Sequence, residues 1–279
     1  MVKFGLPTNP YKPIDEEISR IGSLGFDFAE ICIEEPLNTP KNLANQKERI
    51  LSLLRKNKLF AIGHTAPWVQ FGSSNETERA MWIEEAKDMI DTTSLLEIEL
   101  LNFHFFGRHS LILAKTISKM TFLENFSDAM RELTEYAKKK NIALMLENMP
   151  TENPKINGIS DFSFVMNKIP SLGLHLDVAH AFIEGGMSRV KQYIEKFQSR
   201  LSHVHVHDNH GKHDEHLAIG QGSIDFESVV KWLKEIKYDR TVSFEVFVPE
   251  EAAGKKAVIN NNELIRSREI FKRIWEKTK

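Results

Sequence analysis

Residues 122–148, FLENFSDAMRELTEYAKKKNIALMLEN, contain the pattern that decides the fold. In the first part, Phe122–Lys140, apolar residues recur three and four positions apart, which predicts an amphipathic helix. The second part, Ile142–Asn148, is a short apolar run without regular alternation of apolar and polar residues. Such a run is typical of a parallel strand in a sheet covered by helices. The segment therefore predicts one helix–strand unit of an α/β protein.

This unit recurs along the whole chain. The predicted strands are Val2–Pro7, Phe26–Ile33, Leu59–His64, Ile98–Phe105, Ile142–Asn148, Gly173–Asp177, Leu201–His207 and Val242–Phe247. The predicted helices are Pro13–Leu24, Asn42–Lys56, Glu76–Ile90, Phe122–Lys140, Asp161–Lys168, Ser188–Phe197, Phe226–Ile236 and Glu263–Lys277. Strands that alternate with helices are parallel, and eight such units close into a single (β/α)8 TIM barrel. A doubly wound open sheet is the alternative, but it explains less well why polar residues follow nearly every strand.

Length and composition fit one such domain spanning residues 1–279. The net charge is −2, so no strongly basic field is available to attract nucleic acid over long range. Cys32 is the only cysteine, which excludes an internal disulfide and fits a reducing cytosol. We find neither a signal-peptide layout nor about 20 uninterrupted apolar residues, so we expect a cytoplasmic protein without a membrane span.

Metal-ligating residue types gather at the predicted strand ends, where the active sites of such barrels lie. Six of the eleven histidines fall between His203 and His216, in the run HVHVHDNHGKHDEH. Imidazole and carboxylate groups bind cations such as zinc and manganese. The other strand ends and the loop after the seventh strand add further candidates: His64, His104, Glu147, Asp177, His180, Asp214, His216 and Glu245.

Two of these carboxylates stand out because Glu147 and Glu245 lie within the apolar runs LMLEN and VSFEVF. A carboxylate that faces the interior costs several kcal/mol unless it meets a cation or hydrogen-bond donors. Apart from Lys3 at the start of the first one, the predicted strands contain no Lys or Arg, so a metal ion is the expected counter-charge. Glu30 and Asp208 are candidates for orienting histidine ligands, and His175 is expected to point inward deeper in the barrel.

The constellation resembles the xylose isomerase-like TIM-barrel superfamily, which contains sugar phosphate isomerases and epimerases together with endonuclease IV (AP endonuclease family 2). The resemblance covers nearly the whole chain. The stretches that carry it are LNFH, LEN, LDVAHAF, HVHDNHGKHDEHLAIGQGSIDF and FEV.

In the isomerase and epimerase branch, the resemblance implies one divalent metal, Zn, Mn or Co, held by four residues: Glu147, Asp177, His205 and Glu245. Glu147 and Glu245 would also be catalytic, moving a proton through a metal-stabilised enediolate of a sugar or sugar phosphate. His180 would bond a substrate hydroxyl. Trp68 and Phe105 would form an apolar wall for the substrate, and the basic side chains of Arg108 and Lys212 would hold a phosphate group. Barrels of this group often pair, so a homodimer is expected.

The alternative branch is a zinc-dependent abasic-site endonuclease or phosphodiesterase, and only there would nucleic acid be a partner. It implies three zinc ions held by nine residues: His64, His104, Glu147, Asp177, His180, His205, Asp214, His216 and Glu245. Glu34 and Glu35 weigh against it, because they stand where a phosphate backbone would pass. A non-catalytic metal- or sugar-binding barrel is the third reading. The acidic loop and the low net charge favour the isomerase or epimerase.

Overall fold

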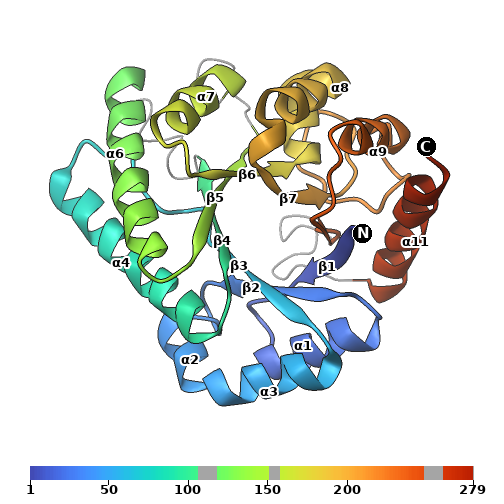
Figure 1. Ribbon diagram of the computed structural model, residues 1–279, viewed down its shortest axis with the longest axis horizontal. Helices are drawn as coiled ribbons and strands as arrows, with labels where there is room; N and C mark the ends of the chain where they lie inside the picture. The colour runs from blue at the N-terminus through green and yellow to red at the C-terminus, as the bar shows by residue number, and fades with distance from the viewer. Residues whose placement is uncertain (106–117, 151–157, 248–259, 279) are drawn as a thin grey trace.

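Eight parallel strands form a closed barrel, in which each strand pairs with its neighbours in the sequence and β1 pairs with β8 (Figure 1). The computed structural model describes residues 1–105, 118–150, 158–247 and 260–278. The strands are β1 Lys3–Pro7, β2 Phe28–Ile33, β3 Phe60–Thr65, β4 Leu100–Phe105, β5 Ala143–Asn148, β6 Gly173–Asp177, β7 Leu201–Val206 and β8 Thr241–Phe244. The predicted barrel is thus confirmed, with strand boundaries that shift by a few residues.

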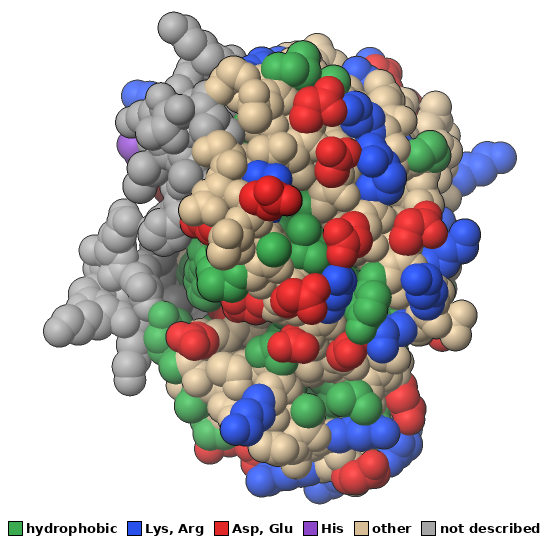
Figure 2. Space-filling model, turned by 90° about the vertical axis from the view of Figure 1, so that its left-hand side faces the viewer, with side chains coloured by type: hydrophobic (Ala, Val, Ile, Leu, Met, Phe, Trp, Pro, Cys, Tyr) green, Lys and Arg blue, Asp and Glu red, His purple; other side chains and the backbone are tan. Residues whose placement is uncertain are grey.

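Helices surround the barrel as an outer ring (Figure 1). They are α1 Ile14–Ser23, α2 Pro40–Asn45, α3 Lys47–Asn57, α4 Glu76–Leu95, α6 Lys119–Lys138, α7 Ile159–Lys168, α8 Val178–Phe197, α9 Phe226–Glu235 and α11 Asn261–Lys277, with a short 3-10 turn at Gln198–Arg200. None of these helices is both long and apolar enough to cross a bilayer. On the face drawn in Figure 2, acidic and basic side chains are interspersed.

Most helix ends shift by up to five residues from the predicted bounds, and two predicted helices differ more. The predicted helix Asn42–Lys56 is two helices that meet at Gln46. The predicted helix Ser188–Phe197 begins earlier, at Val178, because the Asp177 side chain accepts a hydrogen bond from the His180 N–H and caps the helix. Gly185 and Gly186 then kink α8, which hides its first half from a search for helical periodicity.

Aromatic side chains fill much of the space between sheet and helices. Phe105 packs edge-on against Phe126 and Phe162, at ring-centroid distances of 5.2 and 5.6 Å. The prediction that Phe105 lines the substrate site is therefore corrected. Successive strand residues point to opposite faces, so His104 faces the barrel interior and Phe105 faces the helices.

The register of the parallel strands sets the level of the polar residues inside the barrel. His104 on β4 lies opposite Glu147 on β5, and Asp177 on β6 lies opposite His205 on β7. All four residues are buried. Because Glu147 also lies opposite His175, the register places His104, Glu147 and His175 in one row, and Asp177 and His205 in the next row toward the carboxyl ends of the strands.

Candidate active site

A cavity of about 590 Å³ opens at the carboxyl ends of the strands. Most of the predicted site residues line it. They are His64, Trp68, His104, Glu147, His180, Asp214, His216 and Glu245. The cavity therefore lies where a barrel of this type has its active site.

Glu147 is the centre of a first group of ligand-type side chains, with His64 and His104. One ligand atom from each residue lies within 4.8 Å of the others. Glu147 Oε2 is 3.1 Å from His104 Nε2 and 3.5 Å from His64 Nε2. The Asn102 amide donates to the same oxygen at 2.8 Å and accepts from the Thr65 N–H at 2.9 Å, so it fixes the carboxylate.

Asp214 is the centre of a second group, on the side of β6 and β7. Its Oδ2 lies 3.2 Å from His180 Nε2 and 3.1 Å from His216 Nε2. His207 joins this group, since its Nε2 is 3.4 Å from Asp177 Oδ2 and 3.6 Å from Asp214 Oδ1. We did not predict His207 as a ligand from the sequence, although its alternation with His203 and His205 was the available signal.

His205 connects the cavity to the barrel interior. Its Nδ1 is 3.3 Å from Glu245 Oε2 and 3.9 Å from Asp177 Oδ2. Its other ring nitrogen, Nε2, donates to Glu30 Oε2 at 2.8 Å. Glu30 thus holds the imidazole so that Nδ1 points toward Glu245, which lines the cavity, as the hypothesis that Glu30 orients a histidine requires.

Charges in this group are strongly coupled. Burial raises the pKa of Glu147, but His175 and His104 outweigh it and hold that pKa well below the ordinary value. Burial also raises the pKa of Glu245, and His205 and His216 bring it down to about 2. For His216, burial lowers the pKa, and Asp214 and Glu245 raise it to about 9. Glu147 and Glu245 are therefore ionised, and His205 and His216, whose pKa values are raised, carry balancing protons beside Glu245.

These protons occupy places that a divalent cation could take. Several fully buried ligand atoms have no hydrogen-bond partner among the described residues: both ring nitrogens of His64 and His207, His104 Nδ1, Asp177 Oδ2 and Asp214 Oδ1. Buried polar atoms are rarely left unpaired in proteins. Unpaired imidazole and carboxylate atoms around one cavity fit a zinc- or manganese-type ion.

Other predicted residues lie elsewhere. Lys212 is exposed and does not line the cavity, and Arg108 is outside the described residues. Asp208 does not contact a histidine ring as we had considered. Its carboxylate accepts instead from the Gly220 and Ile224 N–H groups, at 2.9 and 3.1 Å. The turn at Gly220 is therefore held by the chain itself, which argues against a role in binding anions.

Comparison with known proteins gives a consistent result. The family described as the xylose isomerase-like TIM barrel matches residues 18–270. The uncharacterized protein MJ1311 of Methanocaldococcus jannaschii is 29% identical over 267 residues, which cover 92% of this chain and 88% of that protein. A probable endonuclease 4 of Campylobacter hominis is 26% identical and covers 67% of this chain and 72% of its own. The crystal structure of a D-tagatose 3-epimerase-like protein superposes with a TM-score of 0.80 at 27% identity, covering 99% of this chain and 97% of the other.

Proposed function

Because the chain belongs to the xylose isomerase-like TIM-barrel family, we propose that it is a divalent-metal-dependent isomerase or epimerase of a sugar or sugar phosphate. The observation that carries the proposal is the presence of two ionised glutamates, Glu147 and Glu245, on one cavity with metal-ligating groups between them. The likeness to a D-tagatose 3-epimerase-like protein supports the same reaction class.

The proposed ligands of one cation are Glu147, Asp177, His205 and Glu245. The distances of His205 Nδ1 from Glu245 Oε2, 3.3 Å, and from Asp177 Oδ2, 3.9 Å, support this set. When bound, the cation would supply Lewis acidity at two adjacent oxygens of a keto sugar. Asp177 and His205 are fully buried, and backbone and side-chain hydrogen bonds fix both. Their geometry is therefore prepared before a ligand arrives, and little reorganisation is needed.

Glu147 and Glu245 are the proposed acid–base pair. A proton at the sugar carbon next to the carbonyl would pass to one carboxylate. The other glutamate would first take up a proton, for example from the His205 or His216 imidazolium beside Glu245, and would then deliver it to the substrate. Ionised carboxylates suit the accepting role at neutral pH. Asn102 donates to Glu147 Oε2 and leaves Oε1 directed toward the His180 side, where Oε1 is 3.5 Å from His180 Nδ1.

His180 and Trp68 are the proposed substrate-binding residues of the described part of the cavity. Burial lowers the pKa of His180, but Asp177 and Asp214 raise it well above the ordinary value, so the ring can donate to a substrate hydroxyl. Trp68 offers an apolar wall for a sugar face. Arg108 stays a predicted contact for a phosphate, whereas the exposed position of Lys212 does not support that role.

Solvent deuterium exchange provides the direct test. The protein is reconstituted with Mn²⁺ or Co²⁺ and incubated in D2O with a panel of ketoses and ketose phosphates, and the sugars are analysed by NMR. We expect deuterium at the carbon next to the carbonyl and a new epimer or isomer. Glu147→Gln and Glu245→Gln should each lower the rate by about 10²–10⁴-fold, while Glu235→Gln, on the exposed end of α9, should not. A panel without exchange or turnover with either metal would remove the proposal.

The number of ligand groups favours a second candidate, a zinc-dependent abasic-site endonuclease. Beyond the four residues above, His64 and His104 flank Glu147, and His180, Asp214 and His216 form a further group. By the resemblance, that nuclease would hold about three zinc ions in the cavity, and such ions would stabilise the attacking and leaving oxygens of a displacement at phosphorus. Incision of a duplex containing an abasic analogue at low salt would support it, and intact duplex in the presence of zinc would exclude it.

A further inference from the structure

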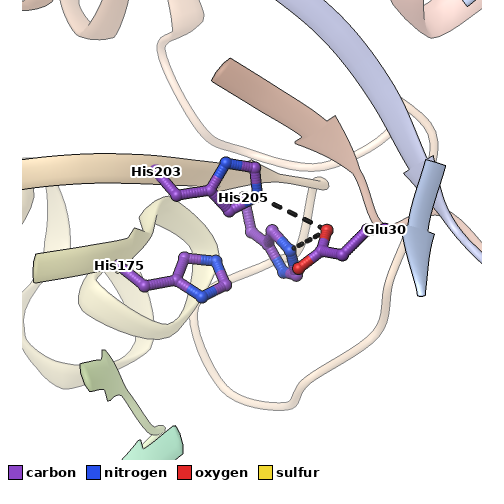
Figure 3. A group of neighbouring side chains, drawn as sticks. All are labelled: Glu30, His175, His203 and His205. Carbon is purple, nitrogen blue, oxygen red and sulfur yellow. Dashed lines mark hydrogen bonds and ion pairs between the residues drawn. The ribbon is translucent and has the colours of Figure 1, made fainter. Parts of the chain in front are cut away.

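A closed cluster of ligand-type side chains lies deeper in the barrel than the cavity. It consists of Glu30 on β2, His175 on β6, and His203 and His205 on β7 (Figure 3), and we call it the deep cluster. All four residues are 0% exposed, and none of them lines the cavity. One ligand atom from each lies within 4.8 Å of the others. The deep cluster is therefore separate from the groups around Glu147 and Asp214, although it shares His205 with the active site.

Two atoms of the deep cluster, Glu30 Oε1 and His175 Nε2, have no hydrogen-bond partner within the described part of the chain. Glu30 Oε2 accepts from His205 Nε2 at 2.8 Å and from Ser243 Oγ at 2.6 Å, but Glu30 Oε1 has no partner. His175 Nε2 has no partner either. Its Nδ1 lies 3.2 Å from Glu147 Oε2 and 3.2 Å from the Asn102 Nδ2 amide, so a carboxylate and an amide hold that side of the ring. With the ring proton on Nδ1 beside the carboxylate, Nε2 has a lone pair for a cation.

His203 completes this arrangement. Its Nδ1 is 2.7 Å from Thr241 Oγ1, a hydroxyl that can donate to it and fixes the ring. Its Nε2 donates to Glu30 Oε2 at 3.4 Å, a proton position that a cation could take instead. Hydrogen bonding among the four residues therefore leaves Glu30 Oε1 and His175 Nε2 unpaired in a dry interior, which is costly for buried polar atoms.

We propose that Glu30, His175 and His203 hold a second divalent cation of the zinc type, beneath the active site and closed off from solvent. Imidazole and carboxylate ligands suit zinc, whereas magnesium and calcium prefer all-oxygen sites. A fourth coordination position faces His205. This cation would join β2, β6 and β7 and would fix Glu30, which in turn orients His205. It would stabilise the barrel and organise the active site without contacting the substrate.

Metal retention after chelation tests this proposal independently of any enzymatic activity. Protein refolded with Zn²⁺ is treated in its folded state with a strong chelator, desalted and analysed for zinc before and after unfolding. Ions in the open cavity should be lost quickly. The ion of the deep cluster should stay until the chain unfolds, giving one retained zinc per chain.

Three variants assign the retained ion. His175→Asn and His203→Asn should each lose it, whereas Glu245→Gln should keep it, because Glu245 belongs to the cavity. His210→Asn is the matched control, since it removes an exposed histidine from the loop after β7. Wild-type protein that retains no zinc, or His175→Asn and His203→Asn proteins that retain it unchanged, would overturn the proposal. If those variants fail to fold, the wild-type retention experiment alone decides, together with an anomalous X-ray map of the chelated crystal.

Discussion

At the scale of single residues, the site depends on carboxylates that are buried together with the groups that neutralise them. Glu30, Glu147 and Glu245 are each surrounded by imidazoles, and each has a pKa below its ordinary value although burial acts in the opposite direction. Removing one partner of such a buried pair leaves an uncompensated charge, which is strongly destabilising. Substitutions here therefore change both stability and metal affinity, and the two effects need separate measurements.

Replacing Glu30 tests its role in orienting His205. Glu30→Gln substitutes a neutral amide for the carboxylate that accepts from His205 Nε2 at 2.8 Å, so His205 becomes a weaker ligand. We expect the affinity of the active-site cation to fall by about 10–100-fold, measured by competitive Co²⁺ titration. Glu235→Gln serves as the control. Unchanged affinity in Glu30→Gln would show that His205 needs no carboxylate partner.

The pH dependence of stability tests the environment of Glu34, which lines the cavity. Burial raises the pKa of Glu34 to about 7 from 4.5, with a smaller lowering effect from His64. A raised folded-state pKa gives stability that is fully present below the unfolded value and is lost as the pH rises through about 7. Glu34→Gln stays neutral and escapes this loss.

The free energy of unfolding of metal-free Glu34→Gln protein should therefore be about 1–2 kcal/mol higher than that of the parent near pH ~8. This figure is already reduced because the Glu34 side chain is partly exposed and solvent screens its charge. Near pH ~4 the two proteins should be alike, because Glu34 is then protonated in both states. Urea unfolding across this range gives the comparison. Equal stability at the alkaline end would mean that Glu34 is well solvated.

At the scale of elements, β7 and the turn that follows it organise the site. His203 and His205 both face the barrel interior and occupy successive layers, one in the deep cluster and one shared with the cavity. Asp208 follows and binds the backbone around Gly220 and Ile224. A Cβ at Gly222 would meet Asp208 Oδ1 at 2.4 Å, so this turn needs glycine. One short segment thus sets both the ligands and the loop that carries Asp214 and His216.

The kink in α8 gives a prediction at this scale. Gly186 has φ +67° and ψ −165°, a conformation that is essentially restricted to glycine, and among the described atoms a Cβ there would meet nothing within 4 Å. Gly186→Ala should therefore cost about 1–3 kcal/mol of unfolding free energy through the backbone alone. Gly185→Ala, at an extended φ of −172°, should cost less. Chemical denaturation of both variants measures the difference, and equal stabilities would mean that α8 straightens without cost.

The grouping of polar residues at the strand ends was easier to predict from the sequence than the boundaries of the elements. Parallel strands have one polarity, so the residues at their carboxyl ends lie at one end of the barrel. There Glu147 Oε1 and Asp177 Oδ1 lie 3.5 and 3.7 Å from His180 Nδ1, and Asp177 lies opposite His205. Two side chains were misjudged for local reasons. Phe105 faces the helices because its neighbour His104 faces inward, and His207 joins the ligand groups because β7 keeps its alternation beyond its last hydrogen-bonded residue. Contacts that depend on tertiary distance, such as that between Asp208 and the turn, were not predictable from spacing.

At the scale of the whole molecule, closure of the barrel places residues that are far apart in the sequence around one cavity. β1 pairs with β8, and the ring of strands brings Glu30 and Glu245 to the same histidine. The interspersed charges in Figure 2, together with a net charge of −2, provide no broad basic surface on that face for a DNA backbone. The homodimer expected from the family resemblance stays a prediction, which sedimentation would test.

An anomalous X-ray experiment on crystals grown with Mn²⁺ tests the central claim most directly, namely that residues from separate strands share a divalent cation in the cavity. We predict an anomalous peak within bonding distance, about 2.0–2.3 Å, of Glu147, Asp177, His205 and Glu245. Crystals that diffract well and show manganese only at surface carboxylates, with none bound by these four side chains, would contradict the account.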